Sequence, residues 1–348
     1  MQSSVNFYKK HFSRIYVEID AFDYPIAKEI ISGFPNATIV EIRHYKDLFN
    51  RPGQDASMQR HSRSLILAVE RAPFLYPGAR VCQDFGNDAF YYTSTVKNCL
   101  FSCDYCYMQG MYRTAYPVIF VNFDDYLSEI DRMSKMKELY ICLSYDTDLI
   151  AMDGLTGYLG RWTDALSLRP KVTAEVRTKG APKSLRPLPN VIYAYTISPE
   201  RVATLYEKGT PSVPDRLRSA AGALGAGARV RLCFDPMIYI RDWKKAYDDM
   251  LDLVSAHLPF EKLEDVSVGG FRMPKEYIRH LKKLYPDSDV VQYPFENSDG
   301  ICHYPKALEE EMIGYLSDAL AERMPKEKIF VIKQEEGEEV WNKGNAQS

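Results

Sequence analysis

The sequence predicts an α/β protein whose main part is a partial (β/α)6 TIM-like barrel, and three observations carry this prediction. Between residues 89 and 285, short β-branched runs alternate with longer segments of helical period, as in successive βα units around a parallel sheet. The β-branched runs are apolar enough for burial on both faces of a sheet. The 348 residues suffice for one large domain or two modest ones, and 46% hydrophobic with 26% charged residues is an ordinary globular composition.

Six strands and six helices make up the predicted barrel. The expected strands are Ala89–Val96, Glu138–Ser144, Val172–Arg177, Val191–Ile197, Ala228–Phe234 and Asp265–Gly269. The expected helices have i, i+3, i+4 apolar spacing, several with an Asp, Ser or Pro start signal, and they are Asp124–Met136, Leu155–Leu166, Pro199–Lys208, Val213–Leu224, Arg241–His257 and Lys275–Leu284. Active sites of such sheets lie at the carboxyl ends of the strands, so the loop after the first strand is expected at the barrel mouth.

Two extensions flank the predicted barrel. Residues 1–88 form a small N-terminal α/β extension, with strands Arg14–Asp20, Thr38–His44 and Ser64–Glu70, helix Pro25–Phe34 and a polar loop at Lys46–Arg63. Residues 286–348 form a C-terminal extension. Its expected parts are the end of a loop at Tyr285–Tyr304, helix Ala307–Ala321, strand Lys328–Lys333 and an acidic tail that includes Glu335, Glu336, Glu338 and Glu339.

Charge and cysteine usage narrow the class of protein and its compartment. The formal net charge of −3 excludes a globally basic nucleic-acid binder, so any phosphate contacts must come from a local patch. No apolar run approaches the length of a membrane span, and the opening residues lack the hydrophobic core of a secretory signal. Seven cysteines, an odd number, fit reduced thiols better than a disulfide framework. We expect a cytoplasmic protein with no membrane partner.

The cysteine motif Cys99-Leu-Phe-Ser-Cys103-Asp-Tyr-Cys106 is the strongest chemical signal in the chain. A structural zinc site closes its shell with four protein ligands, whereas an iron-sulfur cluster held by three thiolates leaves one iron open to a small molecule. Tyr105 and Tyr107 flank the third cysteine. The spacing therefore favours a 4Fe-4S cluster with a vacant iron over structural zinc or three unrelated buried thiols.

This C-x3-C-x2-C spacing, with an aromatic residue before the last cysteine, resembles the signature of the radical S-adenosylmethionine superfamily. Over nearly the full length, the order of landmarks resembles the spore photoproduct lyase family. These landmarks are Tyr16-Val-Glu18, Asp23-Tyr-Pro25, Pro52-Gly53, Cys103-Asp-Tyr-Cys-Tyr-Met108, Val121-Asn122, Asp148-Leu-Ile-Ala-Met-Asp-Gly-Leu-Thr156, Thr178-Lys179, Gly209-Thr-Pro211 and Ile238-Tyr-Ile-Arg-Asp-Trp243.

The resemblance implies two cofactors and the residues that bind them. Cys99, Cys103 and Cys106 become the ligands of a 4Fe-4S cluster. Reductive cleavage of S-adenosylmethionine (AdoMet) then gives a 5′-deoxyadenosyl radical. Tyr105 is expected to contact AdoMet, with three residues at strand ends that have groups suited to its carboxylate, ribose and amino group: Thr147, Lys179 and Thr196. Alternatively, the two threonines cap the following helices and the lysine is an ordinary surface residue.

The reaction implied by the resemblance splits a thymine dimer of DNA by hydrogen abstraction, carbon-carbon cleavage and hydrogen return. Tyr105 and Tyr107 match the family's radical relay. The hydrogen donor of the family, a cysteine on the second barrel strand, is not matched, because Tyr145 stands in its place. Cys82, Cys142 and Tyr145 remain as candidates. The odd offset between Cys142 and Tyr145 turns them to opposite strand faces, which favours Cys82.

The substrate and the redox partner follow less directly. The family's late basic hairpin corresponds here to Val290–Tyr304, which contains no Lys or Arg, although Tyr293, Phe295 and Tyr304 are available to stack on bases. Basic residues near the barrel mouth are Arg241, Lys244, Lys245, Arg272, Lys275 and Arg279. We expect thymine-dimer DNA as substrate and a reductant such as flavodoxin or ferredoxin. The alternatives are a related enzyme with a different, possibly non-DNA substrate, and a non-enzymatic thiolate sensor.

Overall fold

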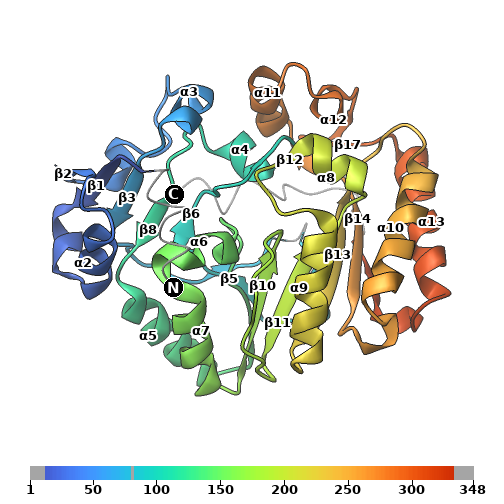
Figure 1. Ribbon diagram of the computed structural model, residues 1–348, viewed down its shortest axis with the longest axis horizontal. Helices are drawn as coiled ribbons and strands as arrows, with labels where there is room; N and C mark the ends of the chain where they lie inside the picture. The colour runs from blue at the N-terminus through green and yellow to red at the C-terminus, as the bar shows by residue number, and fades with distance from the viewer. Residues whose placement is uncertain (1–11, 80–81, 333–348) are drawn as a thin grey trace.

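The computed structural model describes residues 12–79 and 82–332, so the expected acidic tail lies outside the described residues. Its larger sheet has the strand order β18-β14-β13-β11-β10-β9-β5-β4. The six central strands are β5 (Phe90–Tyr92), β9 (Leu139–Cys142), β10 (Val172–Thr178), β11 (Val191–Thr196), β13 (Arg229–Met237) and β14 (Val266–Gly270). Neighbours among these six all pair parallel. The predicted run of six parallel strands is confirmed, and the sheet curls into a half barrel (Figure 1).

Two further strands extend this sheet at its edges. β18 (Ile329–Val331) pairs parallel with β14, opposite Val266 and Val268, so the strand expected in the C-terminal extension is a seventh parallel strand of the barrel sheet. At the other edge, β4 (Tyr76–Pro77) pairs antiparallel with β5.

Helices cover the outer side of the curled sheet (Figure 1). They are α5 (Phe123–Ser134), α6 (Leu149–Thr156), α7 (Tyr158–Ser167), α9 (Val213–Gly225), α10 (Trp243–His257) and α13 (Lys306–Ala321). At the rim, α8 (Glu200–Tyr206) contacts α10, and α11 (Lys275–Leu284) packs against α4 (Tyr107–Met111). The prediction of one helix at Leu155–Leu166 was wrong. Asp148 starts α6 earlier by accepting a hydrogen bond from the Ala151 amide (3.0 Å), and Gly157, at φ 61°, ends it and begins α7.

A second sheet has the order β2-β1-β3-β8-β6 and uses strands from both sides of residue 88. Its strands are β1 (Arg14–Glu18), β2 (Thr38–Ile42), β3 (Leu65–Ala68), β6 (Val96–Lys97) and β8 (Val118–Phe120), with η1 (Ile19–Asp23) and α2 (Pro25–Ser32) packed beside them. The predicted strand Ala89–Val96 is therefore split between the two sheets. Thr93 and Ser94 make the crossing, where their hydroxyls bond the Phe74 carbonyl (2.8 Å) and the Asp146 carboxylate (2.6 Å).

Two segments expected to be loops contain regular structure. Lys46–Arg63 includes α3 (Ala56–His61), which Asp55 caps, and part of η2 (Tyr45–Asp47). Tyr285–Tyr304 includes α12 (Asp289–Gln292) and a hairpin of β16 (Glu296–Ser298) and β17 (Ile301–His303), which pairs with β15 (Arg272–Pro274). Asp299 and Gly300 turn this hairpin at φ 50° and 85°, and the Asp-Gly pair was a readable hairpin signal. Short 3-10 turns at η3 (Phe260–Lys262) and η4 (Lys326–Lys328) complete the fold.

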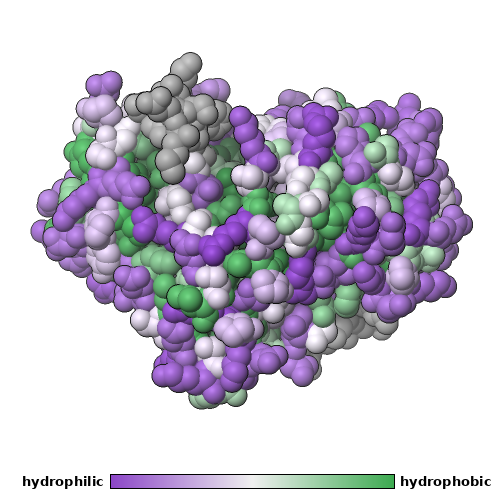
Figure 2. All heavy atoms as spheres, turned by 60° about the horizontal axis from the view of Figure 1, so that its bottom comes forward, coloured by the Kyte–Doolittle hydropathy of each residue, from purple (hydrophilic) through white to green (hydrophobic). Residues whose placement is uncertain are grey.

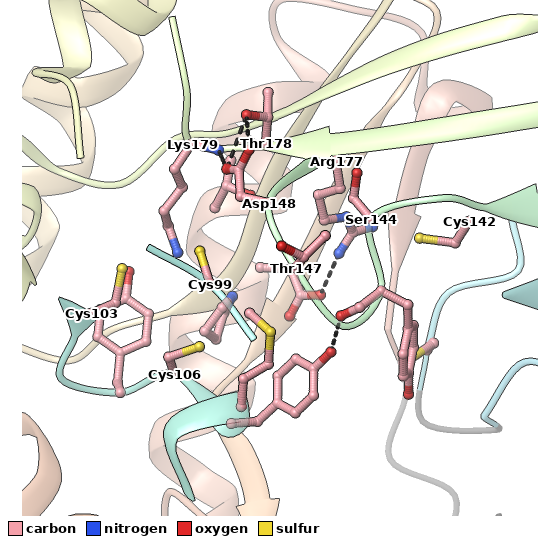
Figure 3. A pocket seen from close by; sticks show the side chains of 18 of the residues that line it. Cys99, Cys103, Cys106, Cys142, Ser144, Thr147, Asp148, Arg177, Thr178 and Lys179 are labelled. Carbon is pink, nitrogen blue, oxygen red and sulfur yellow. Dashed lines mark hydrogen bonds and ion pairs between the residues drawn. The ribbon is translucent and has the colours of Figure 1, made fainter. Parts of the chain in front are cut away.

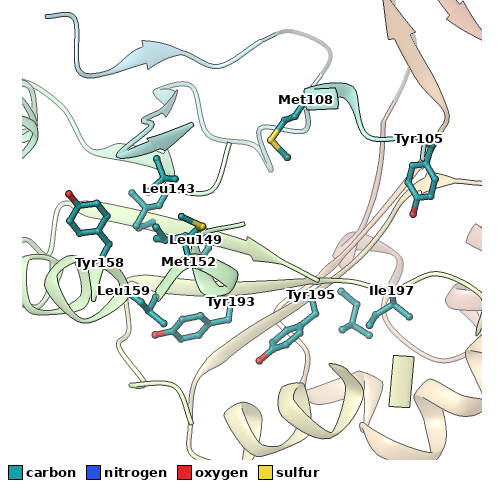
Figure 4. Packing of buried hydrophobic residues seen from close by; sticks show 14 of the residues in the cluster. Tyr105, Met108, Leu143, Leu149, Met152, Tyr158, Leu159, Tyr193, Tyr195 and Ile197 are labelled. Carbon is teal, nitrogen blue, oxygen red and sulfur yellow. The ribbon is translucent and has the colours of Figure 1, made fainter. Parts of the chain in front are cut away.

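The core lies between the helices and the curled sheet. Buried side chains from α6, α7 and β11 pack there, with Met152, Tyr158 and Tyr193 fully enclosed (Figure 4). Hydrophilic side chains cover most of the face in Figure 2, with hydrophobic ones between them. Among the described residues, no helix combines the length and apolar character needed to cross a membrane.

Candidate active site

A cavity of about 250 Å³ opens at the carboxyl ends of the barrel strands. The eleven residues predicted from the sequence as ligands, binding groups or hydrogen donors all line it: Cys82, Cys99, Cys103, Tyr105, Cys106, Tyr107, Cys142, Tyr145, Thr147, Lys179 and Thr196. Parallel topology brings together those that follow barrel strands, because the carboxyl ends of parallel strands meet at one edge of the sheet. Cys82 reaches the cavity from the segment between β4 and β5.

The cysteine loop is held by hydrogen bonds from the backbone and from two polar side chains. Asn98, at φ 71°, accepts from the Cys99 amide (2.9 Å) and donates to the Thr114 carbonyl (2.7 Å). Thr147 donates to the Asn98 carbonyl (2.8 Å). β7 (Ser102–Cys103) pairs antiparallel with β12 (Glu207–Lys208), and α4 (Tyr107–Met111) starts directly after Cys106. The loop is therefore fixed at both ends of the motif.

The three sulfurs gather at one end of the cavity, with the Lys179 side chain pointing toward them (Figure 3). Burial raises the pKa of all three thiols, and Lys179 opposes this at Cys103 and Cys106. Within residues 12–79 and 82–332, no three His, Cys, Asp or Glu side chains converge tightly enough for a single metal ion. Three thiolates are a donor set for a 4Fe-4S cluster, one on each of three irons, with the fourth iron left for another ligand. The cysteines present therefore fit such a cluster.

A buried acidic residue, Glu207, organises the cysteine end. Its carboxylate accepts hydrogen bonds from the Tyr105 hydroxyl and from the Ser198 hydroxyl (2.8 Å). It also pairs with Lys179 (3.7 Å) and with Arg216 (2.5 Å), whose side chain has no exposed surface. Burial acts to raise the pKa of Glu207, but the Lys179 and Arg216 cations outweigh it and hold the pKa below its ordinary value. Glu207 therefore fixes both Tyr105 and Lys179 at the cavity wall. Sequence reasoning missed it.

Replacing Glu207 by Gln is expected to destabilise the protein by about 3–5 kcal/mol, because it leaves the buried Arg216 guanidinium without its counter-charge. Urea unfolding followed by circular dichroism measures this. Arg218→Gln is the matched control, since its pair with Asp215 on the same helix is largely exposed, and its unfolding midpoint should stay at the wild-type value. Equal urea midpoints for both variants would show that Glu207 does not stabilise the fold by neutralising Arg216.

The residues at the strand ends do not act as the helix caps that were one alternative. Asp148 caps α6, and its carboxylate also accepts from the Thr178 hydroxyl (2.9 Å) and the Lys179 amide (2.7 Å). α8, the helix after Thr196, begins without a side-chain cap. Lys179 is 18% exposed, so the alternative of an ordinary surface lysine was wrong. Its ammonium lies 5.0 Å from the centre of the Tyr105 ring.

The three candidate hydrogen donors all reach the cavity, but their contacts differ. The Cys82 thiol lies 3.8 Å from the Tyr145 hydroxyl. Tyr145 stacks on Tyr92, with ring centres 3.9 Å apart, and its carbonyl accepts a hydrogen bond from the Tyr107 hydroxyl. The face argument against Cys142 was wrong, because β9 ends at Cys142 and strand alternation does not continue to Tyr145.

Burial also sets the protonation state of the candidate donor. It raises the pKa of the Cys82 thiol, although Arg272 nearby acts to lower it. A raised pKa keeps the sulfur as S–H at neutral pH, and only the protonated form has a hydrogen atom to donate.

The opposite end of the cavity carries three charged residues. The sequence indicated Asp235, which closes the fifth barrel strand, mainly as a strand terminator and secondly as a contact to cofactor or substrate, and it did not single out Arg177. Arg177, Asp235 and Arg272 line it, and Figure 3 places Arg177 beside Ser144, away from Cys103 and Cys106. The sequence offered Arg272 as a basic position at the barrel mouth, but its side chain is 13% exposed and pairs with Asp235. Charged residues inside apolar strand patterns, such as Glu175 and Arg177 in β10, were the available signal.

Three of the basic residues expected near the barrel mouth are neutralised by ion pairs. Lys244 pairs with Glu311, Lys245 with Asp249 and Arg279 with Glu276, each at 2.7 Å. In the hairpin region, Tyr304 is buried against Phe295 and Tyr293, so it is not available to stack on a base as the sequence suggested.

Comparison with known proteins relates this arrangement to one family. The sequence profile of the family described as spore photoproduct lyase matches residues 11–292. The spore photoproduct lyase of Clostridium acetobutylicum is 26% identical over 291 residues, covering 80% of this chain and 84% of that protein. The spore photoproduct lyase of Bacillus subtilis is 23% identical over 290 residues, covering 79% and 83%.

Solved structures show the same fold. A spore photoproduct lyase complexed with dinucleoside spore photoproduct superposes with a TM-score of 0.78 at 18% identity, covering 93% of this chain and 99% of that one. A doubly substituted variant with bound AdoMet and dinucleoside spore photoproduct has a TM-score of 0.76, with the same identity and coverage. The matched profile spans most of the chain, and the chain therefore belongs to the spore photoproduct lyase family.

Proposed function

We propose that this protein is a DNA-repair lyase that converts spore photoproduct, 5-thyminyl-5,6-dihydrothymine, back to two thymines. One observation carries the proposal: a single cavity has three cysteines at one end and the Cys82 thiol beside Tyr145 further along. The chemistry needs a radical source and a hydrogen donor that face one substrate. Family membership and the substrate bound in the related structure support the same substrate class.

The cysteine end is suited to a 4Fe-4S cluster and AdoMet. Cys99, Cys103 and Cys106 would hold the cluster, which leaves its fourth iron for AdoMet. Lys179 is suited to bind the AdoMet carboxylate, with hydroxyls of Thr147 and Thr196 on the same wall. When bound, the two cofactors supply the carbon-centred radical that takes a hydrogen atom from the lesion. A flavodoxin or ferredoxin is the proposed electron donor, and the reducing cytoplasm is the proposed location.

The chain's own residues then return a hydrogen atom. After the bridging carbon-carbon bond breaks, one thymine retains a methylene radical. The Cys82 S–H bond breaks as a new C–H bond forms on that carbon, which leaves a thiyl radical on Cys82. The Tyr145 hydroxyl, 3.8 Å from that sulfur, gives its hydrogen atom to the thiyl and restores the thiol. Tyr107, whose ring centre lies 6.0 Å from that of Tyr145, would pass a hydrogen atom to the Tyr145 phenoxyl. The bound cofactors would replace the hydrogen atom on Tyr107, which makes the whole sequence redox-neutral.

Tyr145→Phe should leave the first turnover intact and impair the later ones. The variant keeps the Cys82 thiol and so returns one hydrogen atom, but the thiyl radical is not reset, and turnovers per enzyme should fall about ten-fold or more. Single-turnover and multiple-turnover assays on the same holoenzyme measure the split. Tyr91→Phe, on β5 but outside the cavity lining, is the control. Equal losses in both regimes would contradict the relay.

The experiment for the function itself is anaerobic incubation of reduced holoprotein and AdoMet with dinucleoside spore photoproduct, followed by chromatography for thymidine. Two thymidines released from each lesion repaired is the expected result. Release of 5′-deoxyadenosine without repair of either dinucleoside or duplex substrate would overturn the proposal.

A relative with the same cofactors and another substrate is the second candidate. The observation that favours it is the late hairpin, β16 and β17, which has no Lys or Arg and exposes Glu296. Duplex binding depends on phosphate neutralisation. The comparison of dinucleoside with duplex substrate therefore also tests whether this protein acts within DNA or on smaller fragments.

A further inference from the structure

Three charged side chains from β10, β13 and β15 meet at the end of the cavity opposite the cluster cysteines. Asp235, at the end of β13, lies between two arginines: its Oδ1 accepts from Arg272 Nη1 at 2.9 Å, and its Oδ2 lies 3.7 Å from Arg177 Nη1. The side chain of Arg177 is 29% exposed, that of Asp235 9% and that of Arg272 13%. All three line the cavity. We refer to them as the Arg-Asp-Arg triad.

Neighbouring groups hold the triad rigidly. Arg177 Nε donates to Glu175 at 3.0 Å, and Arg272 Nη1 also donates to the Gly270 carbonyl at 3.0 Å. The backbone approaches the triad at Gly269, where a Cβ would lie 2.9 Å from the Asp235 carboxylate and 3.2 Å from Arg272 Nη1. Glycine at this position leaves room for the pair. The triad is thus positioned before any substrate arrives, which lowers the cost of binding.

The triad lies in the part of the cavity where the substrate must react. Arg272, Arg177 and Asp235 are all close enough to Cys82 to act on its charge, and Cys82 is the proposed hydrogen donor. Pro236, next to Asp235 in the chain, also lines the cavity and offers an apolar face to a planar ring.

The order of hydrogen-bonding groups selects a chemical class of ligand. Two guanidiniums with a carboxylate between them follow the order donor, acceptor, donor, and each carboxylate oxygen of Asp235 can accept more than one hydrogen bond. The imide edge of thymine presents acceptor, donor, acceptor through O2, N3–H and O4. Cytosine lacks the central donor, because its N3 is an acceptor. Bases taken out of the stack are commonly read along this edge.

We propose that the Arg-Asp-Arg triad binds the imide edge of one thymine ring of the lesion, with Asp235 accepting from N3–H. This rests on the proposed function, and it deepens that function by naming the residues that select thymine-derived over cytosine-derived photoproducts.

The test uses dinucleoside spore photoproduct and two derivatives methylated at N3, one on each ring. N3 methylation removes the donor. For wild-type holoenzyme we expect one derivative to have a kcat/KM about ten-fold or more below that of the parent, mainly through KM. In Asp235→Asn, repair of the parent should weaken and this methylation penalty should collapse to about two-fold or less. Arg279→Gln is the control, because Arg279 forms an exposed ion pair with Glu276 on α11, and this variant should keep the full N3-methylation penalty.

Two readouts separate failure of the triad from failure of the function. Cleavage of AdoMet without substrate should stay within about two-fold of wild type in Asp235→Asn, which shows that the cysteine end is intact. Arg272→Lys keeps the positive charge but loses the guanidinium fork. It is the replacement test variant if Asp235→Asn does not accumulate as folded protein. If the wild-type enzyme repairs all three substrates at equal rates, the triad assignment alone is overturned. The same holds if Asp235→Asn or Arg272→Lys keeps the full N3-methylation penalty. Repair of none of them overturns the proposed function and this assignment with it.

Discussion

Replacing Cys82 with Ala is expected to lower the yield of restored thymine by about ten-fold or more while AdoMet cleavage continues. The thiol lies 3.8 Å from Tyr145 at the cavity wall, and burial raises its pKa, so it is held as S–H. Without that hydrogen the thymine radical persists until it meets another partner, and adducts replace repaired product. Chromatography of the products, with 5′-deoxyadenosine counted in the same sample, measures both quantities.

Two matched variants make the Cys82 result specific. Cys302→Ala removes a buried thiol of β17 that does not line the cavity, and its product purity should equal that of wild type. Cys142→Ala removes the other candidate thiol at the cavity and should have the smaller effect of the two. Clean repair by Cys82→Ala together with side products from Cys142→Ala would transfer the donor role to Cys142.

Replacing Cys103 with Ala is expected to abolish AdoMet cleavage, with a loss of about a thousand-fold or more, because two thiolates do not retain an open cluster. Cys103 is buried on β7, which β12 holds through the Glu207–Cys103 register. Iron, acid-labile sulfide and 5′-deoxyadenosine, measured on anaerobically purified protein, should fall together.

Cys233→Ala is the control for this loss. Cys233 is equally buried, on β13, but does not line the cavity. It should retain iron and sulfide at the wild-type ratio to protein. A Cys103→Ala variant that keeps its full iron content would contradict the assignment of the three cysteines, and zinc in place of iron in the wild type would favour the structural-site alternative.

The order of barrel elements could be predicted from the sequence because buried parallel strands are locally apolar. β10, β11 and β14 fall within one or two residues of their expected bounds. Sequence reasoning failed where the pairing of a strand depends on tertiary contacts. Val96 and Tyr92 look like one strand, yet they pair in different sheets, and only the partner strand β8 decides this. Likewise, β18 is too short to reveal from sequence that it joins β14.

The candidate site could be predicted where its residues are adjacent in sequence or end a recognisable strand, as with Cys103, Cys106 and Lys179. Glu207 was missed because its role depends on which strands and helices become neighbours. Asp235 was interpreted mainly as the terminator of the fifth strand, with contact to cofactor or substrate as the alternative. Charges within apolar runs were the overlooked signal. Arg231 on β13, 2% exposed, pairs with Glu175 of β10 at 2.5 Å, and such buried charges require partners that the sequence does not name.

The account depends on an iron in the cysteine-bound cluster that remains free to bind AdoMet. Electron paramagnetic resonance of anaerobically reduced protein, recorded with and without AdoMet, tests this most directly. We predict the signal of a reduced 4Fe-4S cluster and a change in its g-values on adding AdoMet. A protein with no cluster signal, or one whose signal AdoMet leaves unchanged, would contradict the account.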